Sequence, residues 1–262
     1  MDLGLSGKRA CVMASSRGLG LGIAQALAAE GASVLLSGRS EDKLAAAVEG
    51  IRATGGTADY IVADLSDKAS VQTLGKLAED TLGGGVDILV NNTGGPPPGK
   101  MVDADTDVLA SHFDAMVMSV VTMTQAVMPG MRARGWGRVI TLGSSGVIQP
   151  IPTLGLSNAI RSALVGWSKS LSTDVAADGV TVNMLLPGRI HTERVDELDG
   201  AAAKRSGASL DDTRAASRAT IPAGRYGTVA EFAAVATFLA SQQASYVTGS
   251  LIRCDGGSIK SV

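Results

Sequence analysis

Short apolar runs alternate with longer amphipathic stretches along most of the chain. Apolar runs bounded by turn-forming residues predict buried strands, and apolar positions that recur with the helical period predict helices. The predicted strands span residues 9–13, 33–37, 58–63, 86–91, 138–142, 180–185 and 250–254. The predicted helices span residues 21–30, 43–52, 70–82, 108–134, 152–177 and 229–240.

This alternation predicts the fold class. Strands that alternate with long helices form right-handed crossovers, which build a parallel sheet with helices on both faces. No linker-like stretch divides the 262 residues, so we expect one α/β domain over residues 1–262.

One segment departs from the pattern. Residues 193–221 are polar, rich in Ala and Ser, and only weakly helical in character. An irregular segment above the carboxyl ends of the strands is typical of a mobile substrate lid, which we predict here; a surface excursion without function is the alternative.

A glycine-containing turn at residues 14–20 follows the first predicted strand and leads into the first predicted helix. The first N–H groups of a helix have no partner and the helix dipole is positive there, so a phosphate can bind. Glycines allow close approach of the backbone, although spaced glycines alone are weak evidence. This glycine turn predicts dinucleotide binding, and a tight turn without ligand remains the alternative. Its predicted contacts are Ser15, Ser16, Arg17, Gly18, Leu19 and Gly20.

Composition narrows the classes of partner. Hydrophobic residues make up 45% and aromatic residues 3%, which suits tightly packed α/β layers. Lys and Arg number 23 against 25 Asp and Glu without blocks of either sign, so neither nucleic acid nor a membrane is an expected partner. The start of the chain does not resemble a signal peptide, and no long apolar stretch occurs, which predicts a cytoplasmic protein. Cys11 and Cys254 lie far apart without nearby ligands, so we expect no metal site and two buried, inert thiols.

Five motifs together resemble the short-chain dehydrogenase/reductase family, in particular its 3-oxoacyl-acyl-carrier-protein-reductase-like branch. They are RGLG at residues 17–20, ADLS at 63–66, NNTG at 91–94, PGRIHT at 187–192 and DGG at 255–257. Their order and spacing match over nearly the whole chain. The resemblance implies a seven-stranded, doubly wound parallel sheet (Rossmann fold), a small-molecule substrate and a homotetramer formed through the two long helices.

The resemblance also implies the remaining cofactor contacts. Asp64 matches the position that meets the adenine, and Ile190 and Thr192 match those that hold the nicotinamide carboxamide. The further predicted contacts are Leu65, Asn91, Thr93, Gly94, Pro187 and Gly188. Ala14 departs from the usual glycine, and its methyl group disfavours a positive φ at the turn.

The type of cofactor follows from charge. An NAD site places a carboxylate after the second strand, but residues 37–40 are SGRS and the first acid is Glu41. Arg39, helped by Arg17, offers forked donors and positive charge to a 2′-phosphate. We therefore predict NADP (NADPH) as the cofactor; a solvated loop arginine is the alternative for Arg39.

Of the catalytic residues of the family, only the serine is retained. The resemblance places Ser157 and Arg161 at the positions of the family's tyrosine and lysine, and Met116 at that of its asparagine, whereas Ser144 remains as the serine after the fifth strand. A serine hydroxyl is a far weaker acid than a phenol, and arginine holds its proton at any working pH. His191 is a candidate proton donor, with a solvent-facing loop histidine as the alternative. Ser144, Ser157, Arg161 and His191 are the predicted catalytic residues.

The run GGPPPG at residues 94–99 predicts a stiff wall of the substrate pocket, because proline fixes φ and restricts its neighbour; a simple rigid turn is the alternative. The whole pattern predicts an NADP-dependent oxidoreductase acting on a carbonyl or alcohol, a 3-oxoacyl compound being one candidate, with a non-standard active site. The alternatives are a catalytically silent NADP-binding scaffold or sensor, and a non-redox enzyme that uses the same pocket.

Overall fold

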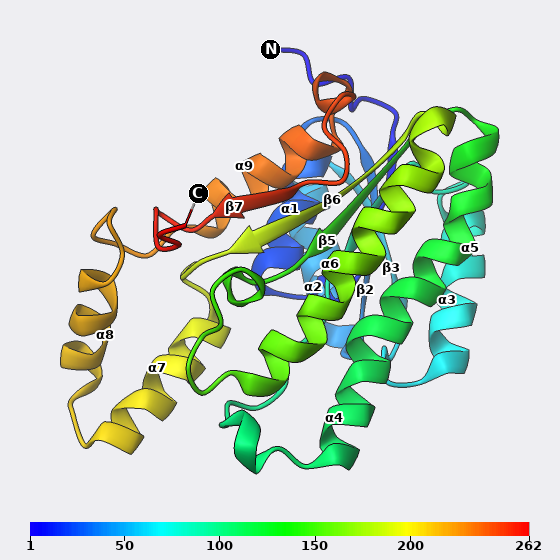
Figure 1. Cartoon of the computed structure of the whole chain (residues 1–262). Helices are drawn as coiled ribbons and strands as arrows, with labels where there is room; N and C mark the ends of the chain where they lie inside the picture. The colour runs from blue at the N-terminus through cyan, green and yellow to red at the C-terminus, as the bar shows by residue number, and fades with distance from the viewer. Residues whose placement is uncertain (262) are drawn as a thin grey trace.

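A single parallel sheet forms the centre of the computed structural model, which describes residues 1–261 (Figure 1). The strands are β1 (Arg9–Val12), β2 (Ser33–Gly38), β3 (Thr57–Val62), β4 (Ile88–Asn91), β5 (Gly137–Leu142), β6 (Val180–Pro187) and β7 (Leu251–Cys254). Their order in the seven-stranded sheet is β3-β2-β1-β4-β5-β6-β7, and every pairing is parallel. The predicted fold class is confirmed.

Helices cover both faces of the sheet, which explains why β4 and β5 are buried along their whole length. The helices are α1 (Gly18–Ala29), α2 (Glu41–Ala53), α3 (Lys68–Thr81), α4 (Thr106–Phe113), α5 (Ser119–Ala133), α6 (Gly155–Val175), α7 (Glu193–Ser206), α8 (Leu210–Ala219) and α9 (Val229–Ala240). One apolar core joins the sheet to α1, α2 and α9, and two others join it to α3, α5 and α6.

The strand order reverses between β1 and β4, which are neighbours in the sheet. From β1 the chain runs outward to β2 and β3, and from β4 it runs outward the other way. In open α/β sheets, ligands bind in the crevice beyond the carboxyl ends of the strands at such a switch point. The glycine turn after β1 and the loop after β4 therefore frame the expected site.

The predicted lid is more regular than we expected. Two helices, α7 and α8, occupy most of it, and they lie beyond the end of β6 (Figure 1). Acidic residues begin α7, basic residues end it, and Gly207 closes it with φ +74°. Ser209 caps α8 by accepting a hydrogen bond from the backbone N–H of Asp212. Caps and charges, rather than a strong apolar period, define these helices, so the expectation of an irregular segment was wrong.

Two further expectations need correction. The helix predicted over residues 108–134 is divided by a π-helical turn, Asp114–Met118, which separates α4 from α5. Cys11 is buried, and burial raises the pKa of its thiol to about 12, but Cys254 is partly exposed rather than buried.

Within residues 1–261, no helix has the length and apolar character needed to cross a membrane. The same residues contain no cluster of three or more side chains suited to hold a metal ion.

Candidate active site

The glycine turn is held by a buried serine. The Ser15 hydroxyl donates a hydrogen bond to the Val12 carbonyl (2.7 Å) and accepts one from the Ser37 backbone N–H (3.1 Å). The side chain thus ties the turn to β1 and β2. The backbone N–H of Ser15 also donates to the Ser37 carbonyl (2.8 Å), so this buried residue supports the turn with both its backbone and its side chain.

Close packing explains why the turn needs Gly20. A Cβ there would lie 2.8 Å from both the Ala14 carbonyl oxygen and the Asn92 side-chain nitrogen. Ala14 and Gly18 both adopt a positive φ, of 46° and 60°. The alanine therefore takes the left-handed conformation that glycine adopts at lower cost.

The N-terminus of α1 is open to an anion. Its capping residue Arg17 makes no side-chain capping bond, and its first turn contains no acidic residue. The first N–H groups of the helix thus keep their capacity for a phosphate.

The loops after β2 and β3 bring Arg39 close to Asp64. The Asp64 carboxylate accepts hydrogen bonds from the backbone N–H (2.9 Å) and hydroxyl (2.8 Å) of Ser66, which together with the charge of Arg39 hold its pKa below the ordinary value. Arg39 itself is exposed. A fixed acceptor and an exposed cation thus lie on the loops that follow the neighbouring strands β3 and β2.

Arg17 is paired with Glu193, the first residue of α7. Both side chains are exposed, and such pairs contribute little free energy, so an incoming phosphate can compete for Arg17. The pair connects the glycine turn to the lid.

The segment after β4 uses its polar side chains mainly for support. The Asn91 side-chain nitrogen donates to the Thr124 hydroxyl (3.0 Å), whereas its side-chain oxygen is buried without a partner. Asn92 donates to the Ala14 carbonyl (2.9 Å) and so joins this segment to the glycine turn. The Thr93 hydroxyl donates to the Gly94 carbonyl (3.0 Å).

The segment after β6 is fixed by close backbone approach. The Gly188 N–H donates to the Cys254 carbonyl (3.0 Å), and a Cβ at Gly188 would lie 2.6 Å from the Asp255 Cα. Ile190 is buried and pairs with Gly227 in an isolated bridge, and Thr192 precedes α7 as its capping residue. These contacts fix the predicted nicotinamide-binding positions.

Ser144 follows β5, and Arg161 on α6 contacts Leu142, the last residue of that strand. The Ser144 hydroxyl oxygen accepts a hydrogen bond from the Gly146 N–H (3.0 Å). Ser157 and Arg161 are four residues apart on α6 and share a helix face. Arg161 donates to the carbonyls of Leu142 (2.9 Å) and Gly94 (3.1 Å), so it joins β5 to the loop after β4.

Burial and the nearby positive charge of Arg194 lower the pKa of Arg161 to about 10. The guanidinium therefore remains charged at neutral pH, as the sequence predicts. Met116 is buried in the π-helical turn and packs in the same apolar cluster as Ile160 and Leu164 on α6. Its thioether offers no strong hydrogen bond to a proton-relaying water.

His191 lies at the outer edge of this arrangement. Its backbone N–H donates to the Gly227 carbonyl (2.8 Å), and its Nε2 atom is 3.5 Å from an Asp196 carboxylate oxygen. The side chain is 63% exposed. This position fits a solvent-facing loop histidine better than an enclosed proton donor.

The profile of a family described as Enoyl-(Acyl carrier protein) reductase matches residues 13–258. The 3-oxoacyl-[acyl-carrier-protein] reductase FabG of Escherichia coli (strain K12) is 35% identical over 258 residues, which cover 97% of this chain and 98% of that protein. The chain belongs to the short-chain dehydrogenase/reductase family. The predicted family is therefore confirmed.

Solved structures agree with this assignment. The L-sorbose reductase of Gluconobacter frateurii, complexed with NADPH and L-sorbose, is 31% identical, covers all of both chains and has a TM-score of 0.94. YwfH, an NADPH-dependent reductase involved in bacilysin biosynthesis, is 28% identical over 98% of this short-chain dehydrogenase/reductase and all of its own chain, with a TM-score of 0.93.

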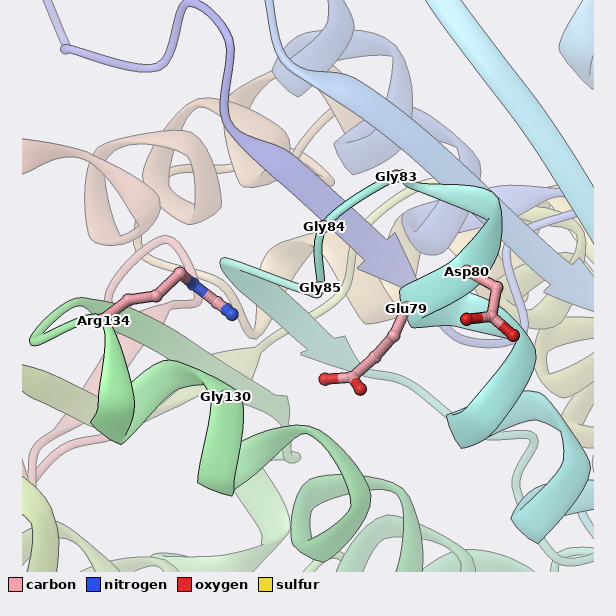
Figure 2. Close-up of a pocket in the computed structure, with 7 residues that line it drawn as sticks. All are labelled: Glu79, Asp80, Gly83, Gly84, Gly85, Gly130 and Arg134. Atoms are coloured by element: carbon pink, nitrogen blue, oxygen red, sulfur yellow. The ribbon is translucent and has the colours of Figure 1, made fainter.

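A separate hollow of about 470 Å³ lies near the amino ends of the strands of this short-chain dehydrogenase/reductase (Figure 2). Figure 2 shows Arg134, which follows α5, and Glu79, from α3, extending toward its middle beside the loop of residues 83–85. None of the predicted site residues lines this hollow. It lies apart from the glycine turn and does not enter the proposed chemistry.

Sequence analysis missed two residues that organise the site. Asn92 stands in a quoted motif, but only the structure shows that its amide holds the glycine turn. Arg194 donates from α7 to the Pro96 carbonyl (2.8 Å), which brings the lid onto the proline-rich loop. No local pattern identified Arg194, because it is one of several charges in a polar segment.

Proposed function

We propose that this chain is an NADP(H)-dependent oxidoreductase that acts on a carbonyl or alcohol group of a small molecule. The main support is the exposed Arg39 beside Asp64, beyond β2, together with the absence of an acid at residues 37–40. A carboxylate there would repel a 2′-phosphate, whereas Arg39 attracts it. The NADPH-binding reductases of the same fold support the same cofactor.

In this proposal, the open N-terminus of α1 holds the pyrophosphate, and the segments after β4 and β6 orient the nicotinamide. When bound, NADPH supplies a hydride to the carbonyl carbon. Ser144 orients the carbonyl, and Arg161 helps to hold the substrate in line with the cofactor. Ser157 is a poor acid and His191 is largely exposed, so we assign the proton to water, with His191 as the alternative donor.

The test is incubation of the purified chain with NADPH and a panel of carbonyl compounds, including acyl-thioesters, followed by NADPH absorbance. We expect NADPH to bind and at least one compound to oxidise it. Binding without oxidation across the panel would contradict a reductase and support a silent binder.

Two alternatives have a specific observation in their favour. Ser157, Arg161 and buried Met116 together remove the usual acid and the polar water site. A catalytically silent NADP-binding scaffold or sensor fits this loss, as does a non-redox enzyme using the same pocket. Unchanged NADPH during conversion of a substrate would identify the latter.

We also propose a homotetramer in the cytoplasm. The expected assembly uses the two long helices, α5 and α6. Support comes from two large apolar side chains left exposed next to α5, Phe113 at the end of α4 and Met118 in the π-helical turn. Analytical ultracentrifugation of the full chain tests this: a monomeric mass would contradict it.

A further inference from the structure

Two arginines from different elements converge on one glycine. Arg161 on α6 donates from Nη2 to the Gly94 carbonyl (3.1 Å), and Arg194 on α7 donates from Nη2 to the Pro96 carbonyl (2.8 Å). Gly95 lies between these two anchors. The point that a Cβ at Gly95 would occupy is 3.7 Å from Arg194 Nη2 and 3.9 Å from Arg161 Nη2. The two guanidinium groups therefore flank a single point.

Their positive charge is only partly balanced. Arg161 bonds to neutral carbonyls, and none of the ion pairs found within residues 1–261 includes it. Arg194 pairs with Glu197 (3.2 Å) in an exposed contact one helical turn away. Two cations and one carboxylate leave a net charge of about +1, and partly buried like charges are costly unless an anion joins them.

The loop beneath the arginines is rigid. Three consecutive prolines at residues 96–98 fix its backbone. The Gly99 N–H donates to the Thr153 carbonyl (2.7 Å), and the Gly155 N–H donates to the Gly99 carbonyl (3.1 Å), so the loop is tied to the start of α6. The carbonyls that hold both arginines are thus fixed before any ligand arrives, which lowers the entropic cost of binding.

We propose that the substrate carries a carboxylate, which Arg161 and Arg194 bind beside Gly95. This inference rests on the proposed function, since it assigns the substrate class of the same site. A single carboxylate matches the net charge of +1 and the planar fork of guanidinium donors. Arg161 also contacts the backbone two residues before Ser144, so the carboxylate lies near the reacting carbonyl. Short 2-oxo or 3-oxo acids have this arrangement.

The test compares acids with their neutral esters on the full chain saturated with NADP⁺. The probes are 2-oxobutanoate, 3-oxobutanoate and the methyl ester of each, with the dissociation constant measured by calorimetry. We expect at least one acid to bind roughly tenfold more tightly than its ester, as the loss of a charged hydrogen-bond partner predicts. Equal binding of acid and ester in both pairs would overturn the proposal.

Substitutions at two arginines of the same helix provide the matched comparison. Arg194→Gln should remove most of the acid preference, and Arg194→Lys should restore part of it. Arg205→Gln is the control, since Arg205 is exposed at the far end of α7 and belongs to no ion pair found in the described part of the chain. An equal loss in Arg194→Gln and Arg205→Gln would show a general charge effect and overturn the assignment.

Failure of the proposed function is distinguishable from failure of this inference. If the acids bind selectively but NADPH is never oxidised in their presence, the arginine site stands and the reductase does not. If the esters are reduced as well as the acids and bind equally, the reductase stands and the carboxylate site does not. If NADP⁺ fails to bind, the same titrations on the free chain still decide whether the arginines select an acid.

Discussion

The glycine turn and the lid are built from different interactions. The turn is held by short hydrogen bonds between buried backbone and side-chain groups, from Ser15 to β1 and β2 and from Asn92 to Ala14. The lid is held mainly by ion pairs, centred on Asp199, which is completely buried and pairs with Arg189 and Arg214. A rigid glycine turn suits a cofactor that binds in one conformation, whereas ion pairs allow the lid to open at a moderate cost in free energy.

The largest expected effect comes from substitutions at two predicted catalytic positions on α6, Ser157 and Arg161. Replacing Ser157→Tyr and Arg161→Lys together restores a phenol beside an ammonium group, and we expect turnover of a simple ketone to rise by roughly 10² to 10⁴-fold, the usual contribution of general acid catalysis. Steady-state oxidation of NADPH measures it.

This experiment needs a control because Arg161 also supports the loop after β4. NADPH affinity of the double variant shows whether the cofactor site survives the change. A variant that binds NADPH normally yet reduces nothing new would contradict family-type reduction and favour the silent or non-redox alternatives.

Asp199→Asn should weaken the lid. The change leaves Arg189 and the Tyr226 hydroxyl, which donates to Asp199 (2.9 Å), beside a neutral amide. Because the Arg189 side chain left behind is 37% exposed, the cost is that of a charged hydrogen bond, about 1.5 to 3 kcal/mol, rather than that of a fully buried ion pair. We expect faster protease cleavage within residues 193–221, measured as the rate of limited proteolysis.

The exposed Asp211→Asn variant, on α8, is the matched control for that experiment. If both variants are cleaved at the rate of the parent, Asp199 does not fasten the lid. If bound NADPH slows cleavage of the parent, the lid is coupled to the cofactor, as the sequence predicts.

Arg39→Ala tests whether Arg39 binds the 2′-phosphate of NADPH. Loss of one charged hydrogen bond should cost about 1.5 to 3 kcal/mol, so NADPH binding should weaken by roughly ten- to a hundredfold. NADH has no 2′-phosphate and serves as the internal control: its affinity should hardly change. Fluorescence titration of both cofactors measures this, and equal losses would refute the role of Arg39.

Sequence analysis predicted the glycine turn better than the lid. Buried strands and glycine turns leave local signals, so the seven strands, their order along the chain and the glycine turn were predictable. The lid helices depend on caps and on ion pairs such as that of Asp199 with Arg189. These polar interactions follow no apolar period, so no pattern of hydrophobic positions announces them. The convergence of Arg161 and Arg194 exists only after α6 and α7 are placed beside one loop.

Asp87 is a second buried carboxylate that pairs with two arginines, Arg9 and Arg134. Its contribution to stability depends on pH. Burial opposes ionisation of Asp87, but hydrogen bonds from Arg9 (2.8 Å) and the charge of Arg134 (3.2 Å) outweigh it and hold the pKa of Asp87 below its ordinary value. A lowered carboxylate pKa contributes stability above the unfolded value of about 4, and this contribution is lost as the pH falls through the folded pKa.

Asp87→Asn should therefore lower the unfolding free energy by about 1 to 3 kcal/mol at pH 7 and flatten its decline below about pH 4. Urea unfolding at pH 7 and pH 3 measures both effects. A variant with the parent's acid slope would show that Asp87 does not carry this dependence.

The smallest expected effect compares the glycine turn with a second position of strained backbone, outside the lid. Ala14 in the glycine turn and Thr153 before α6 are the non-glycine residues with positive φ, of 46° and 64°, within residues 1–261. Left-handed backbone costs an L-residue about 1 kcal/mol relative to glycine, so Ala14→Gly and Thr153→Gly should each relieve strain of that order. The greater entropy of glycine in the unfolded chain offsets part of the gain in unfolding free energy.

NADPH affinity distinguishes the two positions. Ala14→Gly should tighten binding by a factor of about two to five, because the turn reaches its binding conformation more easily. Thr153→Gly should leave the affinity unchanged. Equal effects of both variants on affinity would mean that strain in the turn is not what limits cofactor binding.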